Sequence, residues 1–143
     1  MISPCEKKRR QAGFTLIELL VVLVILGLLA GLVGPKVLGY LDTSRTKTAH
    51  LQIEELAAAL DLYKLDNGAY PDNTQGLAAL VSAPPGATRW HGPYLAKGKL
   101  PDDPWGFHYH YRCPGEHGEY DLYSLGKDDR EGGEGEDQDV TNW

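Results

Sequence analysis

Residues 13–35 read GFTLIELLVVLVILGLLAGLVGP, and this stretch decides how the chain folds. From Phe14 to Gly34 it carries a single charge, that of Glu18. An α-helix rises about 1.5 Å per residue, so about 20 such residues span the roughly 30 Å hydrocarbon core of a membrane. The sequence therefore predicts a transmembrane or assembly helix over residues 14–35.

The residues before this helix are basic, with Lys7, Lys8, Arg9 and Arg10 in a row. Basic residues beside a membrane span stay on the cytoplasmic side, which places everything after the span outside the inner membrane. A secretory signal peptide also begins with a basic segment, but no small-residue A-x-A cleavage site follows this apolar run. We therefore expect a single-pass anchor in the cell inner membrane, with the C-terminal domain in the periplasm.

The helical pattern continues beyond the apolar run and becomes amphipathic. Five apolar residues recur at alternating spacings of four and three, which is one face of a helix: Ala49, Ile53, Leu56, Leu60 and Tyr63. Asp66-Asn67-Gly68 supplies a stop signal. Pro35 is expected to kink or locally melt the helix, because proline lacks a backbone donor.

One helix of about 50 residues is implied, and a small domain cannot bury such a helix along its full length. Lipid or other copies of the chain must cover the rest. This is the main argument from the residues for a filament subunit.

The remainder of the chain predicts little regular structure apart from one hairpin. Glycine and proline interrupt residues 67–106, except for a short helical patch at 74–82, and Trp90, Tyr94 and Trp105 are expected to fasten this region to the core. Residues 107–112 and 119–125 favour β-strands joined by a turn at 114–118. The predicted fold class is α+β: a long N-terminal helix packed on a small antiparallel β-sheet with irregular loops.

Charge and cysteine content exclude several classes of protein. The 143 residues hold 14 Lys and Arg against 20 Asp and Glu, a net charge of −6, which argues against a nucleic-acid binder. The two cysteines are Cys5 and Cys113. If the basic N-terminal segment is removed, Cys113 has no partner within the chain, so disulfides do not stabilise the fold.

The C-terminal segment, residues 126–143, reads GKDDREGGEGEDQDVTNW and is strongly acidic. A solvated acidic tail is the usual interpretation of such a run. Val140 and Trp143, however, are apolar residues that would anchor the far end of a loop. A loop tied at both ends and rich in carboxylates repels itself unless it holds a hard cation, and calcium accepts carboxylate and backbone oxygens. The spacing of an EF-hand is absent.

The start of the apolar run resembles the class III signal of type IV pilins and pseudopilins. The matching residues are Gly13, Phe14-Thr15-Leu16-Ile17 and Glu18 after a basic leader. The resemblance implies that a prepilin peptidase removes residues 1–13 by cutting between Gly13 and Phe14, and that Phe14 becomes N-methylphenylalanine. It also implies that Glu18 neutralises the N-terminus of an adjacent subunit during assembly. The alternative is that Glu18 extends to the membrane interface.

From Gly13 to the end, the chain resembles the major-pseudopilin family of type II secretion systems, within the type IV pilin-like superfamily. Besides the N-terminal helix, the matching stretches are LDLYKLDNG at 60–68, YP at 70–71, TQGL at 74–77, GPY at 92–94, DPWG at 103–106, YDLYSLG at 120–126 and DVTNW at 139–143. The resemblance implies a periplasmic domain over 36–143 that polymerises into a helical pseudopilus filament, a homo-oligomer driving export of folded proteins across the outer membrane. Minor pseudopilins and an inner-membrane assembly platform are the implied partners.

The same resemblance implies one structural calcium ion in a C-terminal loop at 125–143. Asp128 matches the family's first ligating aspartate and Asp139 the last, while Leu125 and Arg130 match positions that supply backbone carbonyls. Gln138 stands where the family often has an aspartate, so Asp137 or, alternatively, Glu136 must substitute.

Two rival interpretations remain. One is a minor pseudopilin or a competence-type pilin. The other is a membrane-anchored, calcium-dependent periplasmic enzyme, although no nucleophile elbow, phosphate-binding loop or CxxC motif occurs. His117, Asp121 and Ser124 are close in sequence, but on a hairpin they are expected mostly to face apart. The prediction is a structural subunit without enzymatic activity.

Overall fold

A computed structural model describes residues 13–143 of the chain. The elements in order are helix α1 (Leu16–Asn67), 3₁₀-helix η1 (Gly76–Leu80), strands β1 (His110–Arg112) and β2 (Asp121–Ser124), 3₁₀-helix η2 (Gly135–Asp137) and strand β3 (Val140–Thr141). The chain divides into two compact units between Leu38 and Gly39. The predicted leader, apart from Gly13, lies outside the described residues.

The N-terminal unit contains a long apolar helical segment. Leu16–Gly34 is 19 residues long with a mean hydropathy of 3.0, and none of it is buried. Its length of about 28 Å matches the hydrocarbon thickness of a bilayer. Length and composition are therefore those of a membrane-spanning helix.

The backbone of α1 stays helical at Pro35. The sequence predicted that Pro35 would either kink the helix or locally melt it, and local melting is wrong. Proline removes only one backbone donor, and the turns on either side keep their own hydrogen bonds.

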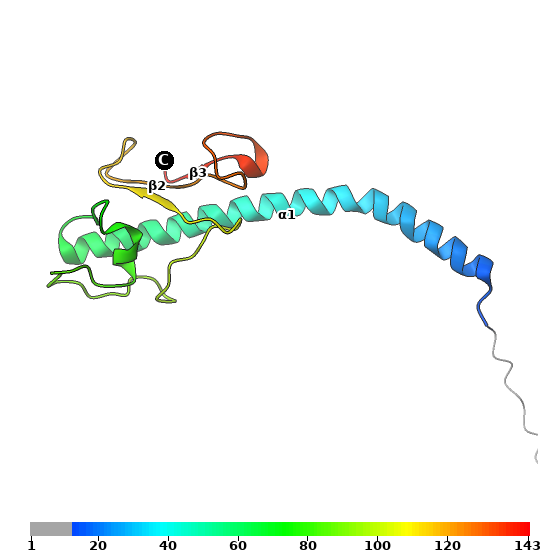
Figure 1. Ribbon diagram of the computed structural model, residues 1–143, viewed down its shortest axis with the longest axis horizontal. Coiled ribbons are helices and arrows are strands. Elements are labelled where there is room, and N and C mark those ends of the chain that lie inside the picture. Colours follow the sequence, from blue (N-terminus) through cyan, green and yellow to red (C-terminus); the bar gives the residue numbers. More distant parts are fainter. Residues whose placement is uncertain (1–12) are drawn as a thin grey trace, which may run out of the picture. The chain divides into compact units, whose positions relative to one another are not determined.

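The C-terminal unit, Gly39–Trp143, holds the entire hydrophobic core. The predicted stripe on the helix is buried as expected, with Ala49, Leu56 and Leu60 fully enclosed. Leu80, Leu122 and other residues from η1, the sheet and the loops pack against it. Figure 1 shows β2 and β3 lying along the part of α1 that belongs to this unit. The core is complete without the apolar N-terminal segment.

The sheet has three antiparallel strands in the order β1-β2-β3. The predicted hairpin is confirmed, with His110 opposite Tyr123 and Arg112 opposite Asp121. The third strand was not predicted: Val140 and Tyr123 pair with Ser124 and Thr141 respectively. A two-residue strand gives no alternating pattern, so only its apolar Val140 signalled an anchor.

The irregular region between α1 and β1 is fastened as predicted. Gly68 ends the helix with φ of 87°, a conformation that glycine adopts without strain. Trp90, Tyr94 and Trp105 are partly buried against the core. The indole N–H of Trp90 donates to the Ala79 carbonyl at 2.8 Å. The predicted fold class, a long helix with a small antiparallel sheet, is confirmed.

Candidate functional site

The polar residues at the start of the apolar helix form a capping box. Thr15 precedes the first helical residue, and its backbone N–H donates to Glu18 Oε2 at 2.8 Å. The Thr15 hydroxyl donates to the same oxygen at 3.0 Å, and the Glu18 N–H donates to the Thr15 hydroxyl at 3.3 Å. This reciprocal arrangement satisfies N–H groups that every helix start leaves without a partner.

Glu18 therefore has hydrogen-bond partners in the single subunit. Thr15 was not singled out from the sequence, although Thr15-x-x-Glu18 is the spacing of a capping box and could have revealed it. The sequence suggested two roles for Glu18, pairing with another subunit and reaching the membrane interface. The structure adds a third role, capping of the helix. The carboxylate also fixes the first turn of the helix.

The acidic C-terminal segment is a folded loop that doubles back on itself. The Lys127 N–H donates to the Glu136 carbonyl at 2.9 Å, which closes the loop across its base. Gly126 sits at this crossing with φ of 71°, and a Cβ there would lie 2.7 Å from the Glu136 carbonyl oxygen. Only glycine fits such a contact, so the two ends of the loop are held together by close backbone approach.

Asp139 supplies an unsatisfied buried oxygen to this loop. Its Oδ2 accepts the Gly132 N–H at 3.0 Å. Its Oδ1 is buried and accepts no hydrogen bond from the described residues. A buried carboxylate oxygen without a donor is costly, and a bound cation is one arrangement that satisfies it.

The other predicted metal ligands are spread along the same loop. Asp128 Oδ1 accepts the Arg130 N–H at 3.2 Å, which forms a tight turn. Leu125 lines the cleft beside the loop together with Asp139. Within residues 13–143, no three acidic, histidine or cysteine side chains converge on one point. A cation bound here would depend on backbone carbonyls for much of its shell, as proposed for Leu125 and Arg130.

The two candidates for the missing aspartate lie in different surroundings. Glu136 is nine-tenths buried, and its oxygens contact Arg45, Trp105 and Lys127. Asp137 is only partly buried, and its carboxylate forms no hydrogen bond or ion pair with the other residues of 13–143. The structure thus favours Asp137 over Glu136 as the carboxylate able to turn toward a cation.

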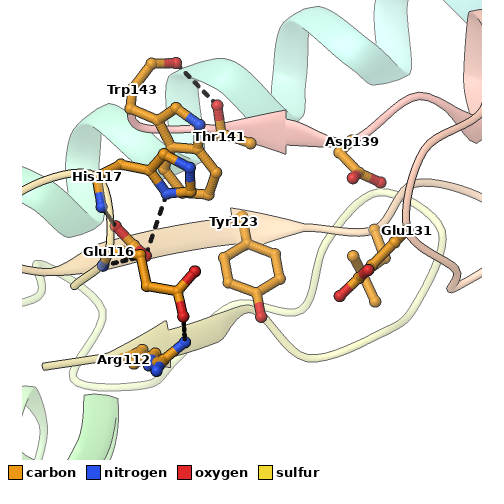
Figure 2. Close-up of a pocket in the computed structure, with 10 residues that line it drawn as sticks. Arg112, Glu116, His117, Tyr123, Glu131, Asp139, Thr141 and Trp143 are labelled. Carbon is orange, nitrogen blue, oxygen red and sulfur yellow. Dashed lines mark hydrogen bonds and ion pairs between the residues drawn. The ribbon is translucent and has the colours of Figure 1, made fainter.

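A cleft of about 310 Å³ opens between the acidic loop and the β1–β2 turn. Figure 2 shows Asp139 and Glu131 on one side of it, the stacked rings of His117 and Trp143 on the other, and Tyr123 between them. The His117 and Trp143 rings are 4.0 Å apart and nearly parallel. The loop and the C-terminus therefore border the same cleft.

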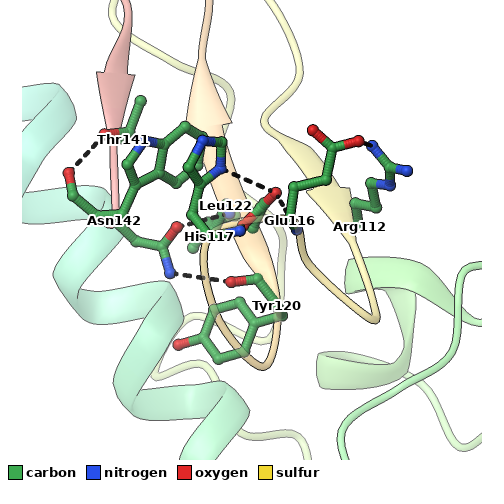
Figure 3. A network of polar contacts seen from close by, with 9 residues as sticks. Arg112, Glu116, His117, Tyr120, Leu122, Thr141 and Asn142 are labelled. Carbon is green, nitrogen blue, oxygen red and sulfur yellow. Dashed lines mark hydrogen bonds and ion pairs between the residues drawn. The ribbon is translucent and has the colours of Figure 1, made fainter.

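The C-terminus is fastened to the sheet by a polar network (Figure 3). Asn142 extends the pairing of β3, since its Oδ1 accepts the Leu122 N–H at 2.8 Å and its own N–H donates to the Leu122 carbonyl at 3.0 Å. Burial tends to raise the pKa of Asp121, but the N–H groups of Glu116 and His117 outweigh it, so the pKa lies below its usual value. No sequence pattern predicted this role of Asn142, because its partners are backbone atoms.

His117 and Asp121 do not face apart as expected. His117 Nδ1 lies 3.3 Å from Asp121 Oδ2, because the turn between β1 and β2 curls back over the strand end. Ser124 takes no part in this pair. Its hydroxyl donates to Asp103 Oδ2 at 2.6 Å in the interior. The three residues therefore do not form a Ser-His-Asp triad.

Comparison with known families matches nearly the whole chain in two segments. Residues 36–143 match the family described as "Type II secretion system (T2SS), protein G". Residues 8–34 match the "Prokaryotic N-terminal methylation motif". The boundary between the matches falls close to the boundary between the two structural units.

Similar proteins cover the same length. "Type II secretion system core protein G" of Pseudomonas aeruginosa is 51% identical over 140 residues, which is 96% of this chain and 98% of the relative. The protein of the same name from Vibrio cholerae is 47% identical over 96% of this chain and 95% of its own.

A solved structure is similar as well. The crystal structure of the major pseudopilin from the type 2 secretion system of enterohaemorrhagic Escherichia coli matches with a TM-score of 0.60 and 35% identity. The match covers 74% of this chain and 92% of that chain.

Proposed function

The chain belongs to the type II secretion system protein G family of major pseudopilins, and we propose that its copies leave the inner membrane to build a periplasmic filament that pushes folded proteins outward. In this proposal the domain from Lys36 to Trp143 stands on the periplasmic side, minor pseudopilins and an inner-membrane platform assist, and the chain carries out no chemistry itself.

One observation carries the proposal. Apart from Glu18, the segment Leu16–Gly34 is apolar and none of it is buried, while the core of the domain, from Ala49 to Val140, is complete without it. Apolar surface of this extent is stable only when lipid or another apolar surface covers it. A helix that suits both environments allows the subunit to exchange lipid for neighbouring copies.

The polar start of the helix gives this exchange a direction. Cutting between Gly13 and Phe14 would place a positive α-amino group on Phe14, four residues before the helix-capping carboxylate of Glu18. In the assembled filament that carboxylate would pair with the N-terminus of an adjacent copy. A buried charge that gains a partner on assembly favours the assembled state over the isolated subunit.

We further propose one structural calcium ion in the loop 125–143. The support is the buried Oδ1 of Asp139, which lacks a donor among the described residues, and the close backbone crossing at Gly126. Asp128 and Asp137 would complete the carboxylate ligands, with the carbonyls of Leu125 and Arg130. Calcium accepts such mixed oxygen shells of six to eight ligands, whereas the smaller magnesium ion requires a tighter octahedron.

Absence of catalysis is part of the proposal. Its support is the purely structural engagement of the polar residues that a hydrolase would need. The Ser124 hydroxyl donates to Asp103, and His117 stacks on Trp143 with its Nδ1 lying 3.3 Å from Asp121 Oδ2.

The processing step makes a direct prediction. The mature protein should begin at Phe14 and carry one added methyl group, because the basic residues end and the apolar helix begins at that point. Intact-mass measurement of the protein purified from membranes checks this. A mature chain that retains Lys7 to Arg10, or one cut after the apolar run, would contradict it.

A further inference from the structure

Glu136 is the most heavily engaged carboxylate of the acidic loop, and it is turned away from the solvent. Its side chain is 9% exposed. Oε1 accepts from an Arg45 guanidinium nitrogen and from the Trp105 indole N–H, both at 3.4 Å. Oε2 accepts from Lys127 Nζ at 2.8 Å. The donors come from α1, from the turn before β1 and from the start of the loop itself.

Unlike the carboxylate of a surface ion pair, the Glu136 carboxylate is mostly buried and has two cationic partners. A carboxylate that loses most of its water needs opposite charge and hydrogen-bond donors to remain ionised in the interior. Here one cation, Arg45, belongs to a helix far away in sequence, and the other, Lys127, belongs to the opposite limb of the loop. The side chain therefore joins the loop to the helix at one fixed point.

From this geometry we propose that Glu136 is not a calcium ligand but the positioning residue that fixes the calcium ligands on either side of it. The inference rests on the calcium site proposed above. Asp137 follows Glu136 directly in the chain, and Leu125 lies two residues before Lys127. Lys127 is bound to Glu136 twice, through Nζ to the carboxylate and through its backbone N–H to the carbonyl at 2.9 Å.

Both limbs of the loop are therefore set by one residue. The close approach of Gly126 to the Glu136 carbonyl leaves the backbone no room to slide. If the carboxylate contact with Arg45 is lost, the Leu125 carbonyl and the Asp137 carboxylate lose their shared anchor. Residues that orient metal ligands without touching the metal commonly change its affinity by about 10- to 100-fold when they are replaced.

The experiment measures the calcium dissociation constant of the full-length protein in detergent, by titration against a chromophoric chelator after metal removal. Three variants are compared with the wild type: Glu136→Gln, Arg45→Gln and Glu134→Gln. Glu134 is an exposed carboxylate two residues before Glu136, and no contact of its side chain is observed among the described residues, so its variant controls for the loss of one negative charge. Arg45 is half exposed, so its variant is expected to fold even if Glu136→Gln does not.

The sign of the Arg45 effect separates positioning from simple charge. Removing a positive charge near the loop should tighten calcium binding if only long-range electrostatics act. Positioning predicts the opposite: both Glu136→Gln and Arg45→Gln weaken binding, by about tenfold for Glu136→Gln, while Glu134→Gln stays close to the wild type.

Each other outcome has one meaning. Tighter binding by Arg45→Gln, or equal loss in Glu134→Gln and Glu136→Gln, overturns the positioning role and leaves the calcium site standing. Wild-type calcium affinity in both Glu136→Gln and Arg45→Gln also overturns the positioning role and leaves the calcium site standing. A wild-type protein that binds no calcium overturns the proposed site itself, and the positioning role with it.

Discussion

The domain comprising residues 36–143 is expected to melt at a clearly lower temperature in chelator than in millimolar calcium. The loop from Asp128 to Asp139 holds seven carboxylates in twelve positions, and these repel one another when no cation is present. Its loosening would release β3 and the stacked ring of Trp143. This domain contains the whole core described above, so its unfolding reports on the loop without the membrane segment.

The size of this effect follows from mass action. Calcium at a hundredfold excess over its dissociation constant stabilises the folded state by about 2.7 kcal/mol. In a domain of this size that corresponds to a Tm difference of about 10–20 °C. Differential scanning calorimetry with calcium, with chelator and with magnesium measures it. Magnesium should restore little of the difference.

Variants localise the effect to the proposed ligands. Asp128→Ala and Asp139→Ala should abolish the difference between calcium and chelator, whereas Glu134→Ala should largely keep it. Equal Tm values for the wild type with calcium and with chelator would show that the loop is only a solvated acidic end.

Glu18→Ala is expected to insert into the membrane normally and to assemble poorly. Removing a charge from hydrocarbon favours insertion. In the filament, however, the N-terminus of the adjacent copy would be left buried without its partner, which costs about 2–5 kcal/mol per contact. The assembled fraction, measured by crosslinking in membranes, should therefore fall about tenfold or more, since 1.4 kcal/mol corresponds to a factor of about ten.

The capping box supplies the controls for this experiment. Glu18→Gln keeps an acceptor for Thr15 but removes the charge, and Thr15→Val keeps the charge but removes the hydroxyl. If pairing between copies is decisive, Glu18→Gln should behave like Glu18→Ala, and Thr15→Val should retain most of the assembly. Normal assembly of Glu18→Ala would leave helix capping or an interfacial position as the whole role of this residue.

The sequence was sufficient wherever a long periodic pattern determined the structure. The stripe from Ala49 to Tyr63 predicted both the helix and its buried face, and Gly68 predicted where it ends. The alternating residues of β1 and β2 predicted the hairpin. These features repeat over many residues, so their local preferences and their burial agree.

The parts that could not be predicted depend on single contacts between distant residues. Glu136 meets Arg45 from 91 positions away, and nothing in either local sequence indicates it. Asn142 extends the sheet by bonding to backbone atoms of Leu122. Bonds to backbone atoms do not depend on the partner's side chain, so the sequence pattern does not indicate them. The candidate calcium loop was recognised from its charge and from family resemblance, whereas the turn that brings His117 to Asp121 required the folded chain.

In the proposed function, copies of this chain form a filament through the apolar helix. Electron microscopy of cells that overproduce the full-length protein together with its secretion machinery tests this most directly, with antibodies against residues 36–143 identifying the subunit. Labelled filaments are expected for the wild type and few or none for Glu18→Ala. Correctly processed wild-type protein that remains a dispersed membrane monomer, with no labelled filaments, would contradict it.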